Sequence, residues 1–85
     1  MNSKLLNDII GWDVVNWGKS IKFFEKNIDF SKMKNGLEIG AGSFGGYALY
    51  FAKKKLITTC SNPEGEFGNI KKIHSSYPFA KKIKY

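Results

Sequence analysis

The feature that most constrains the fold is a glycine-rich stretch at residues 37–46, LEIGAGSFGG. Leu37 and Ile39 flank Glu38, and this alternation predicts a short buried strand. The glycines that follow allow a sharp turn and let a ligand approach the backbone. The apolar segment 47–54 then predicts a helix. A strand, a glycine turn and a helix N-terminus together present free backbone N–H groups to a polar or anionic ligand group.

Glu38 separates two classes of nucleotide-binding turn. Gly40, Gly42 and Gly45 have the spacing G-x-G-x-x-G, which is also the dinucleotide fingerprint. In dinucleotide-binding folds the strand is an almost continuous apolar run, and a carboxylate at its end would repel the pyrophosphate. A carboxylate there suits a ligand that carries an ammonium or sulfonium group. The alternative without a ligand is a glycine turn in an ordinary α/β unit.

The stretch LEIGAGSFGG resembles the first glycine motif of class I S-adenosylmethionine-dependent methyltransferases, in which an acidic and an apolar residue precede Gly-x-Gly. The similarity continues more loosely through residues 45–66. It implies that S-adenosyl-L-methionine is the cofactor and that the Glu38 carboxylate holds its methionine end through hydrogen bonds. The residues of the turn that are implied to cradle the cofactor are Gly40, Ala41, Gly42, Ser43 and Gly45.

Residues after the turn predict a second strand and a second helix. Segment 56–60 is β-branched and mostly apolar, which is typical of a strand. Asn62, Pro63 and Glu64 predict a helix start, with asparagine as the N-cap. Residues 81–85 predict the beginning of a third strand. With right-handed crossovers, the order strand-helix-strand-helix-strand gives part of a doubly wound, Rossmann-like parallel sheet.

The chain ahead of the turn predicts one amphipathic helix. Asp13 is the expected N-cap, and Gly18 weakens the helix enough to leave open a start near that residue. We therefore divide the chain into an N-terminal helical segment, residues 1–35, and the first half of a Rossmann-like methyltransferase domain, residues 36–85. The apolar face of the helix recurs at spacings of three and four residues and consists of Val14, Trp17, Ile21, Phe24 and Ile28.

Three residues of this segment are candidates to cover the cofactor site, although ordinary packing is the favoured interpretation of all three. They are Trp12, Asp13 and Trp17.

The end of the second strand departs from the nucleotide-binding pattern. An acidic side chain usually grips the ribose hydroxyls there, about 20 residues after the glycines. The corresponding positions in this chain are Cys60, Ser61 and Asn62, and none is acidic. Asn62 can accept a hydrogen bond from a ribose hydroxyl, and Glu64 or Glu66 can substitute for the missing carboxylate.

The length of 85 residues reaches only the third strand of the larger sheet that the resemblance implies. We therefore expect a cofactor-binding portion of a methyltransferase that is incomplete and inactive alone, with an unidentified methyl acceptor. Methyl transfer depends mainly on placing the acceptor in line with the methyl group, so no catalytic residue is assigned. An open sheet edge predicts self-association or pairing with a complementary C-terminal fragment.

Composition bounds the alternatives. The net charge of +7 comes entirely from scattered lysines, whereas nucleic-acid readers rely on arginine, so we expect a solvated surface and no nucleic-acid partner. A basic binding module and a fragment of an NAD-dependent oxidoreductase remain the other interpretations. Cys60 has no disulfide partner, and no signal peptide or membrane run is present, which favours a cytoplasmic protein. His74 is expected to pack or to lie at the surface, and no metal-ligand spacing occurs.

Overall fold

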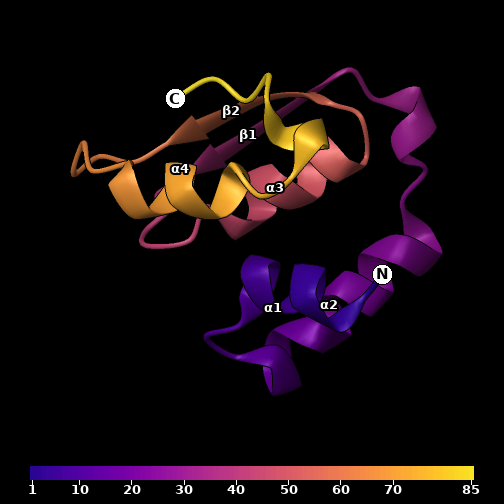
Figure 1. The fold of residues 1–85 in the computed structure, drawn as a ribbon. Helices are drawn as coiled ribbons and strands as arrows, with labels where there is room; N and C mark the ends of the chain where they lie inside the picture. Colours follow the sequence, from indigo (N-terminus) through magenta and orange to yellow (C-terminus); the bar gives the residue numbers. More distant parts are fainter.

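The computed structural model describes all 85 residues. The sheet forms one layer, α3 and α4 lie against one side of it, and α1 and α2 pack on the far side of α3 (Figure 1). The chain is therefore an α/β protein with its helices on one side of a small parallel sheet. The elements are α1 Ser3–Ile10, α2 Val14–Asn27, η1 Phe30–Lys32, β1 Asn35–Ile39, α3 Gly46–Lys53, β2 Ile57–Ser61, α4 Gly68–His74 and η2 Pro78–Ala80.

The sheet has two parallel strands, β1 and β2, in a register that places Glu38 beside Cys60. The third strand expected at residues 81–85 is reduced to a single parallel bridge from Lys84 to Thr59. The Lys84 N–H donates to the Thr58 carbonyl at 3.0 Å, and the Cys60 N–H donates to the Lys84 carbonyl at 2.7 Å. The predicted order of the elements is thus present, but the sheet is smaller than expected.

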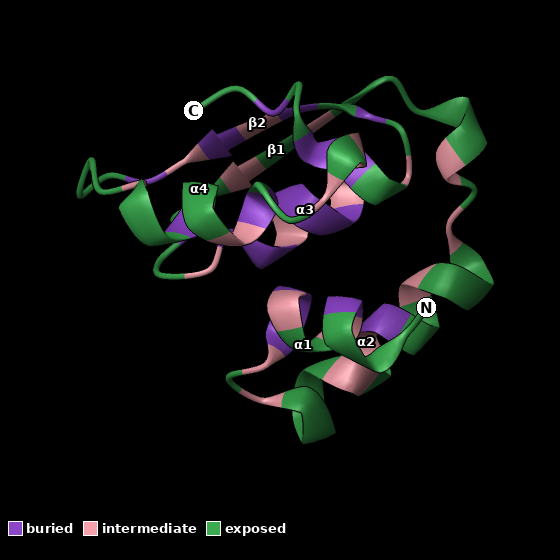
Figure 2. Ribbon diagram, in the orientation of Figure 1, coloured by how far each residue is buried: buried purple, intermediate pink, exposed green.

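Strand β1 contains no buried residue, whereas α3 is mostly buried (Figure 2). Side chains alternate between the two faces of a strand. Glu38 faces α3, so its neighbours Leu37 and Ile39 face the side that no helix covers, where they are 56% and 74% exposed. The prediction that they flank Glu38 in a buried strand is therefore wrong.

Helix α2 begins where its capping residue predicts. The Asp13 Oδ1 atom accepts a hydrogen bond from the Asn16 N–H at 3.2 Å, which confirms Asp13 as the N-cap. The helix starts at Val14, so Gly18 does not delay it. Of the predicted apolar face only Ile21 is fully buried.

Helix α1 was not predicted. The Asn2 Oδ1 atom caps it by accepting the Leu5 N–H at 2.8 Å. Its buried face, which includes Ile9 and Ile10, packs against α3. The two helices approach so closely that a Cβ atom on Gly46 would lie 1.8 Å from the Ile9 carbonyl oxygen. The last glycine of LEIGAGSFGG is therefore required by packing and not by backbone conformation.

Helix α4 begins at Gly68 and not at Asn62, so the prediction of an Asn62 N-cap is wrong. The Gly65 N–H donates to the Asn62 carbonyl at 2.9 Å and closes a turn. Gly65 has φ +73°, a left-handed conformation that interrupts a helix. Ile70 and His74 form the buried face of α4.

The contact between α1 and α3 can be tested with two glycine substitutions. Gly46→Ala is expected to destabilise the fold by about 1–3 kcal/mol or more, because the added methyl group overlaps the α1 backbone. Gly68→Ala is the matched control, since a Cβ there meets no atom within 4 Å and alanine favours helices by about 1 kcal/mol. Urea unfolding followed by circular dichroism measures both, and equal effects of the two substitutions would contradict the packing.

Candidate functional site

The glycine turn adopts a conformation that only glycine tolerates easily. Gly40, Gly42 and Gly45 have φ values of +73°, +62° and +58°. A Cβ atom on Gly40 or Gly42 would meet no other atom within 4 Å, so these two positions border open space. The turn is therefore open at Gly40 and Gly42. Gly45 lines neither of the two hollows that lie beside the turn and packs against α4, since a Cβ atom there would lie 2.7 Å from the Ile70 side chain.

The Glu38 carboxylate binds the first turn of α3. One carboxylate oxygen accepts the Ala48 N–H at 2.9 Å, and the other accepts the Tyr47 N–H at 3.4 Å. Gly45, the N-cap residue, has no side chain to do this. Burial raises the pKa of Glu38, and the two backbone hydrogen bonds act against that rise. Glu38 thus places a half-buried carboxylate between β1 and the positive end of the α3 dipole.

A hollow of about 660 Å³ opens beside β1 and the glycine turn, and we call it the β1 hollow. This volume is within the range of small-molecule sites. The backbone N–H groups of Gly42, Ser43 and Phe44 have no partner within the chain. The lining comes from β1, the glycine turn, α1 and α3 and comprises Ile9, Trp12, Leu37, Glu38, Ile39, Gly40, Ala41, Gly42, Ser43, Phe44, Gly46, Tyr47 and Phe51.

The residues ahead of β1 reach this hollow through Trp12. Trp12 follows α1 and lines the β1 hollow, and its ring centroid lies 5.1 Å from that of Trp17. Trp17 packs edge-on against Tyr47 at 6.2 Å. Of the three candidates for covering the site, Trp12 lines the hollow, Trp17 packs against Trp12, and Asp13 caps α2.

A second hollow of about 580 Å³ lies on the other side of the turn, and we call it the β2 hollow. Gly42 and Ser43 line both hollows. Glu64 and Glu66 are exposed and line the β2 hollow only. The remaining lining residues are Asn62, Gly68, Asn69 and Ile70.

The Asn62 side chain ties the glycine turn to the segment that follows β2. Its Nδ2 group donates to the Glu66 carbonyl at 2.7 Å and to the Gly42 carbonyl at 3.4 Å. Its Oδ1 atom accepts the Glu64 N–H at 3.3 Å. The buried carboxamide is therefore bonded to the backbone on both sides of the β2 hollow.

Ala41 has a similar joining role. Its N–H donates to the Ser61 carbonyl at 3.0 Å, and its carbonyl accepts the Gly45 N–H at 3.1 Å. Its backbone therefore ties the turn to β2, and its N–H is not free for a ligand.

His74 is buried, in agreement with the expectation that it packs, but its contact with the glycine turn was not predicted. Its Nε2 atom lies 2.9 Å from the Gly45 carbonyl and its Nδ1 atom 2.8 Å from the Tyr85 hydroxyl. A carbonyl can only accept, so Nε2 carries the proton, and in the neutral ring Nδ1 accepts from Tyr85. Burial lowers the pKa of His74, which favours this neutral form. The sequence places His74 four residues after Ile70, on the same face of α4, which could have indicated burial. Its hydrogen bond to Gly45 spans 29 positions and could not be read from neighbouring residues.

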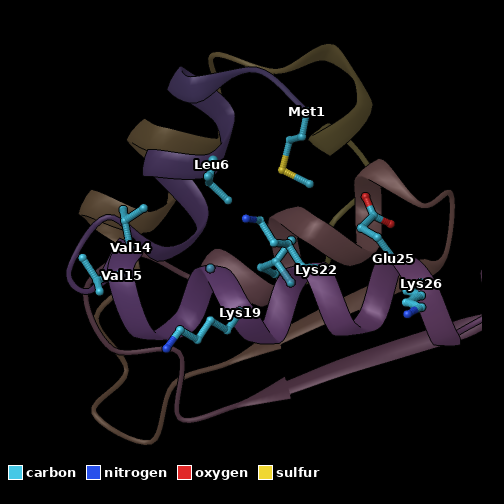
Figure 3. A pocket seen from close by; sticks show the side chains of 10 residues that line it. Met1, Leu6, Val14, Val15, Lys19, Lys22, Glu25 and Lys26 are labelled. Carbon is cyan, nitrogen blue, oxygen red and sulfur yellow. The ribbon is translucent and has the colours of Figure 1, made fainter.

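The largest hollow, about 720 Å³, is a groove between α1 and α2 (Figure 3). Met1, Leu6 and Val14 give it an apolar wall, and the Lys22 side chain extends from α2 towards Leu6. The Glu25 carboxylate is bound by the Tyr50 hydroxyl and pairs with Lys54. This groove shares no residue with the hollows beside the turn, so it is not part of the glycine site.

Comparison of the chain with protein-family models, with curated proteins and with solved structures gives no match. None of the helices has both the length and the hydropathy that crossing a membrane requires. The side chains contain no cluster of three or more His, Cys, Asp or Glu groups that could hold a metal ion. The geometry of the turn is therefore the basis for assigning a function to this chain.

The His74 contact predicts a pH dependence. Because the folded-state pKa lies below the ordinary value of 6.5, the unfolded chain binds the proton more readily. The contribution of His74 to stability is complete above about pH 6.5 and is lost as the pH falls through the lowered folded-state pKa. Glu38 titrates with the opposite sign, since its folded-state pKa is raised. We therefore expect a ring titration midpoint below 6.5 by NMR.

Urea unfolding of a variant isolates the contribution of His74 to the pH dependence of stability. His74→Gln should reduce the loss of stability between about pH 6.5 and 5 that urea unfolding measures in the parent chain. An unshifted ring pKa, or an unchanged pH profile in the variant, would contradict the buried contact.

Proposed function

We propose that this chain binds S-adenosyl-L-methionine at the glycine turn and is the cofactor-binding part of a methyltransferase with a partial Rossmann-like fold. The observation that carries the proposal is the half-buried Glu38 carboxylate beside a hollow that is lined by two glycines with positive φ, Gly40 and Gly42. A carboxylate in that position favours a cationic ligand group. The open space at Gly40 and Gly42 leaves room for the ligand to approach the backbone.

The β1 hollow suits the methionine end of the cofactor. The Glu38 carboxylate would accept hydrogen bonds from the ammonium group while it keeps its contacts with α3, since each carboxylate oxygen can accept more than one hydrogen bond. The free N–H groups of Gly42, Ser43 and Phe44 would donate to the cofactor carboxylate. The Glu38 carboxylate and these neutral N–H donors would fix the orientation of the amino acid, because they bind its ammonium and carboxylate groups respectively.

The β2 hollow suits the ribose. Since Gly42 and Ser43 line both hollows, a long ligand can cross the turn from one to the other. Asn62 is occupied by backbone contacts, so the ribose hydroxyls would donate to Glu64 or Glu66 instead. In this arrangement Asn62 shapes the β2 hollow. Glu64 or Glu66 supplies the carboxylate that nucleotide-binding folds usually carry at the end of the second strand.

The bound cofactor would supply an activated methyl group on its sulfonium. The residues of this chain would bind and orient it, and Trp12 would border the amino acid end on the side of α1. A positioned sulfonium needs no protein nucleophile, because most of the rate comes from the alignment of acceptor and methyl group. We therefore assign no catalytic residue and no methyl acceptor.

The charge of Glu38 is the most direct test of the proposal. Glu38→Gln keeps an acceptor oxygen for the α3 N–H groups but removes the charge. A hydrogen bond to a charged group contributes about 1.5–3 kcal/mol, so the dissociation constant for S-adenosylmethionine should rise roughly tenfold to a hundredfold. Isothermal titration calorimetry measures this change.

Asp29→Asn is the matched control for Glu38→Gln. Asp29 caps η1 through the Ser31 N–H, lies outside both hollows, and asparagine caps equally well. This control removes the same charge and should leave the affinity unchanged. Equal affinities of the parent chain and Glu38→Gln would refute the assignment of Glu38.

The ribose assignment can be tested separately with partial ligands. A double substitution, Glu64→Gln with Glu66→Gln, should weaken the binding of adenosine several-fold and leave the binding of methionine unchanged. The reason is that the two side chains line only the β2 hollow. Chemical shift changes in amide NMR titrations give both affinities, and an equal loss for the two ligands would argue against the division.

A further inference from the structure

Helix α2 has an apolar side that the rest of the chain leaves open. Of its 14 residues only Ile21 is fully buried. Val14 and Val15 are 39% and 78% exposed, and both line the groove between α1 and α2. A helix in a protein gains most of its stability from the packing of its apolar face. An open apolar groove of about 720 Å³ beside α2 therefore indicates a surface for another molecule.

Three ammonium groups line the same groove. The Lys22 side chain extends over the groove towards Leu6 (Figure 3). Lys19 and Lys26 lie on α2 about one helical turn before and after Lys22. All three lysines are exposed, and none forms an ion pair. The three cations thus follow the helix over seven positions, which is about 10 Å along its axis.

The acidic residue of the groove does not neutralise these lysines. Glu25 lines the groove, but its carboxylate pairs with Lys54 and accepts a hydrogen bond from the Tyr50 hydroxyl at 3.1 Å. Lys54 follows the last residue of α3 and does not line the groove. The groove therefore combines an apolar wall with a line of three uncompensated positive charges.

We propose that this groove binds an acidic amphipathic helix of a partner protein. Such a helix places an apolar stripe, at positions i, i+3, i+4 and i+7, in a hydrophobic groove. The stripe would cover Val14 and Val15. Carboxylates at the same spacing beside the stripe would face Lys19, Lys22 and Lys26, because both helices rise by about 1.5 Å per residue.

The charge pattern favours this occupant over three others. A second copy of the chain lacks the complementary surface, since none of its helices carries more than one acidic residue. A fatty acid has a single carboxylate and would leave two of the three ammonium groups without a partner. A nucleic acid would place its phosphates against an apolar wall, and the chain has no arginine for bidentate contacts.

Fluorescence anisotropy of a labelled peptide tests the proposal on the full chain. The probe is a capped peptide of about 18 residues, long enough to form a helix in water, with a leucine stripe and glutamate on both flanks. We expect saturable binding with a dissociation constant below about 100 µM. This constant should rise with salt, because ions screen the attraction. The same peptide with lysine in place of glutamate should not bind.

A triple variant places the binding on α2. Lys19→Gln, Lys22→Gln and Lys26→Gln together should raise the dissociation constant of the acidic peptide about tenfold, since three exposed ion pairs are lost. The matched control removes the same charge from exposed lysines that do not line the groove, and it should leave the constant within about twofold of the parent value. It consists of Lys32→Gln, Lys72→Gln and Lys81→Gln.

A substitution in the apolar wall tests the sign of the charge. Val15→Asp places a carboxylate in the groove, where it should repel the acidic peptide. The side chain is 78% exposed and lies in the first turn of α2, where an acidic residue is tolerated. Val15→Asn is the neutral control and should weaken binding less than Val15→Asp.

Three results would overturn the proposal. They are no saturable binding of the acidic peptide, equal losses in the two triple variants, and binding of dodecanoate without binding of the peptide. The replaced side chains are all exposed, so every variant should keep the dispersed amide NMR spectrum of the parent chain. The groove shares no residue with the hollows beside the glycine turn, and no cofactor is added. Failure here would therefore leave the proposed function standing.

Discussion

The contact between the Glu38 carboxylate and the N-terminus of α3 is the interaction on which the rest of the structure depends. It fixes the direction in which β1 presents its side chains, because Glu38 must face the helix. Leu37 and Ile39 consequently face the uncovered side of the sheet. Partial burial of the carboxylate costs free energy, as its raised pKa shows, and two backbone hydrogen bonds offset part of that cost.

The glycine turn that follows Glu38 is held from several sides. Ala41 bonds to β2, Asn62 reaches the Gly42 carbonyl, and His74 binds the Gly45 carbonyl. These contacts fix a backbone with three positive φ angles before any ligand arrives. A site that is already ordered loses less conformational entropy on binding, which favours affinity. The clamped turn and the charge of Glu38 thus serve the same proposed function.

Local features were predictable from the sequence, and long-range ones were not. The structure confirms the Asp13 cap, the sharp turn at the glycines and the presence of β1 and β2. Each of these features depends on residues that are close together in the sequence. Alternation around Glu38 could not say which face is covered, since that depends on α3. The Asn62 cap is a local prediction that failed, because Gly65 interrupts the chain three residues later. The contact of His74 joins residues 29 positions apart and could not be predicted.

The most direct measurement is a two-dimensional amide NMR titration of the labelled chain, first with S-adenosylmethionine and then, in a separate sample, with NAD. We predict saturable shifts for Gly40, Gly42 and Ala48, whose amides lie in the turn or bind Glu38. NAD should cause little change there, because its pyrophosphate would meet the Glu38 carboxylate. No response to S-adenosylmethionine, or an equal response to NAD, would contradict the binding of S-adenosylmethionine at the glycine turn.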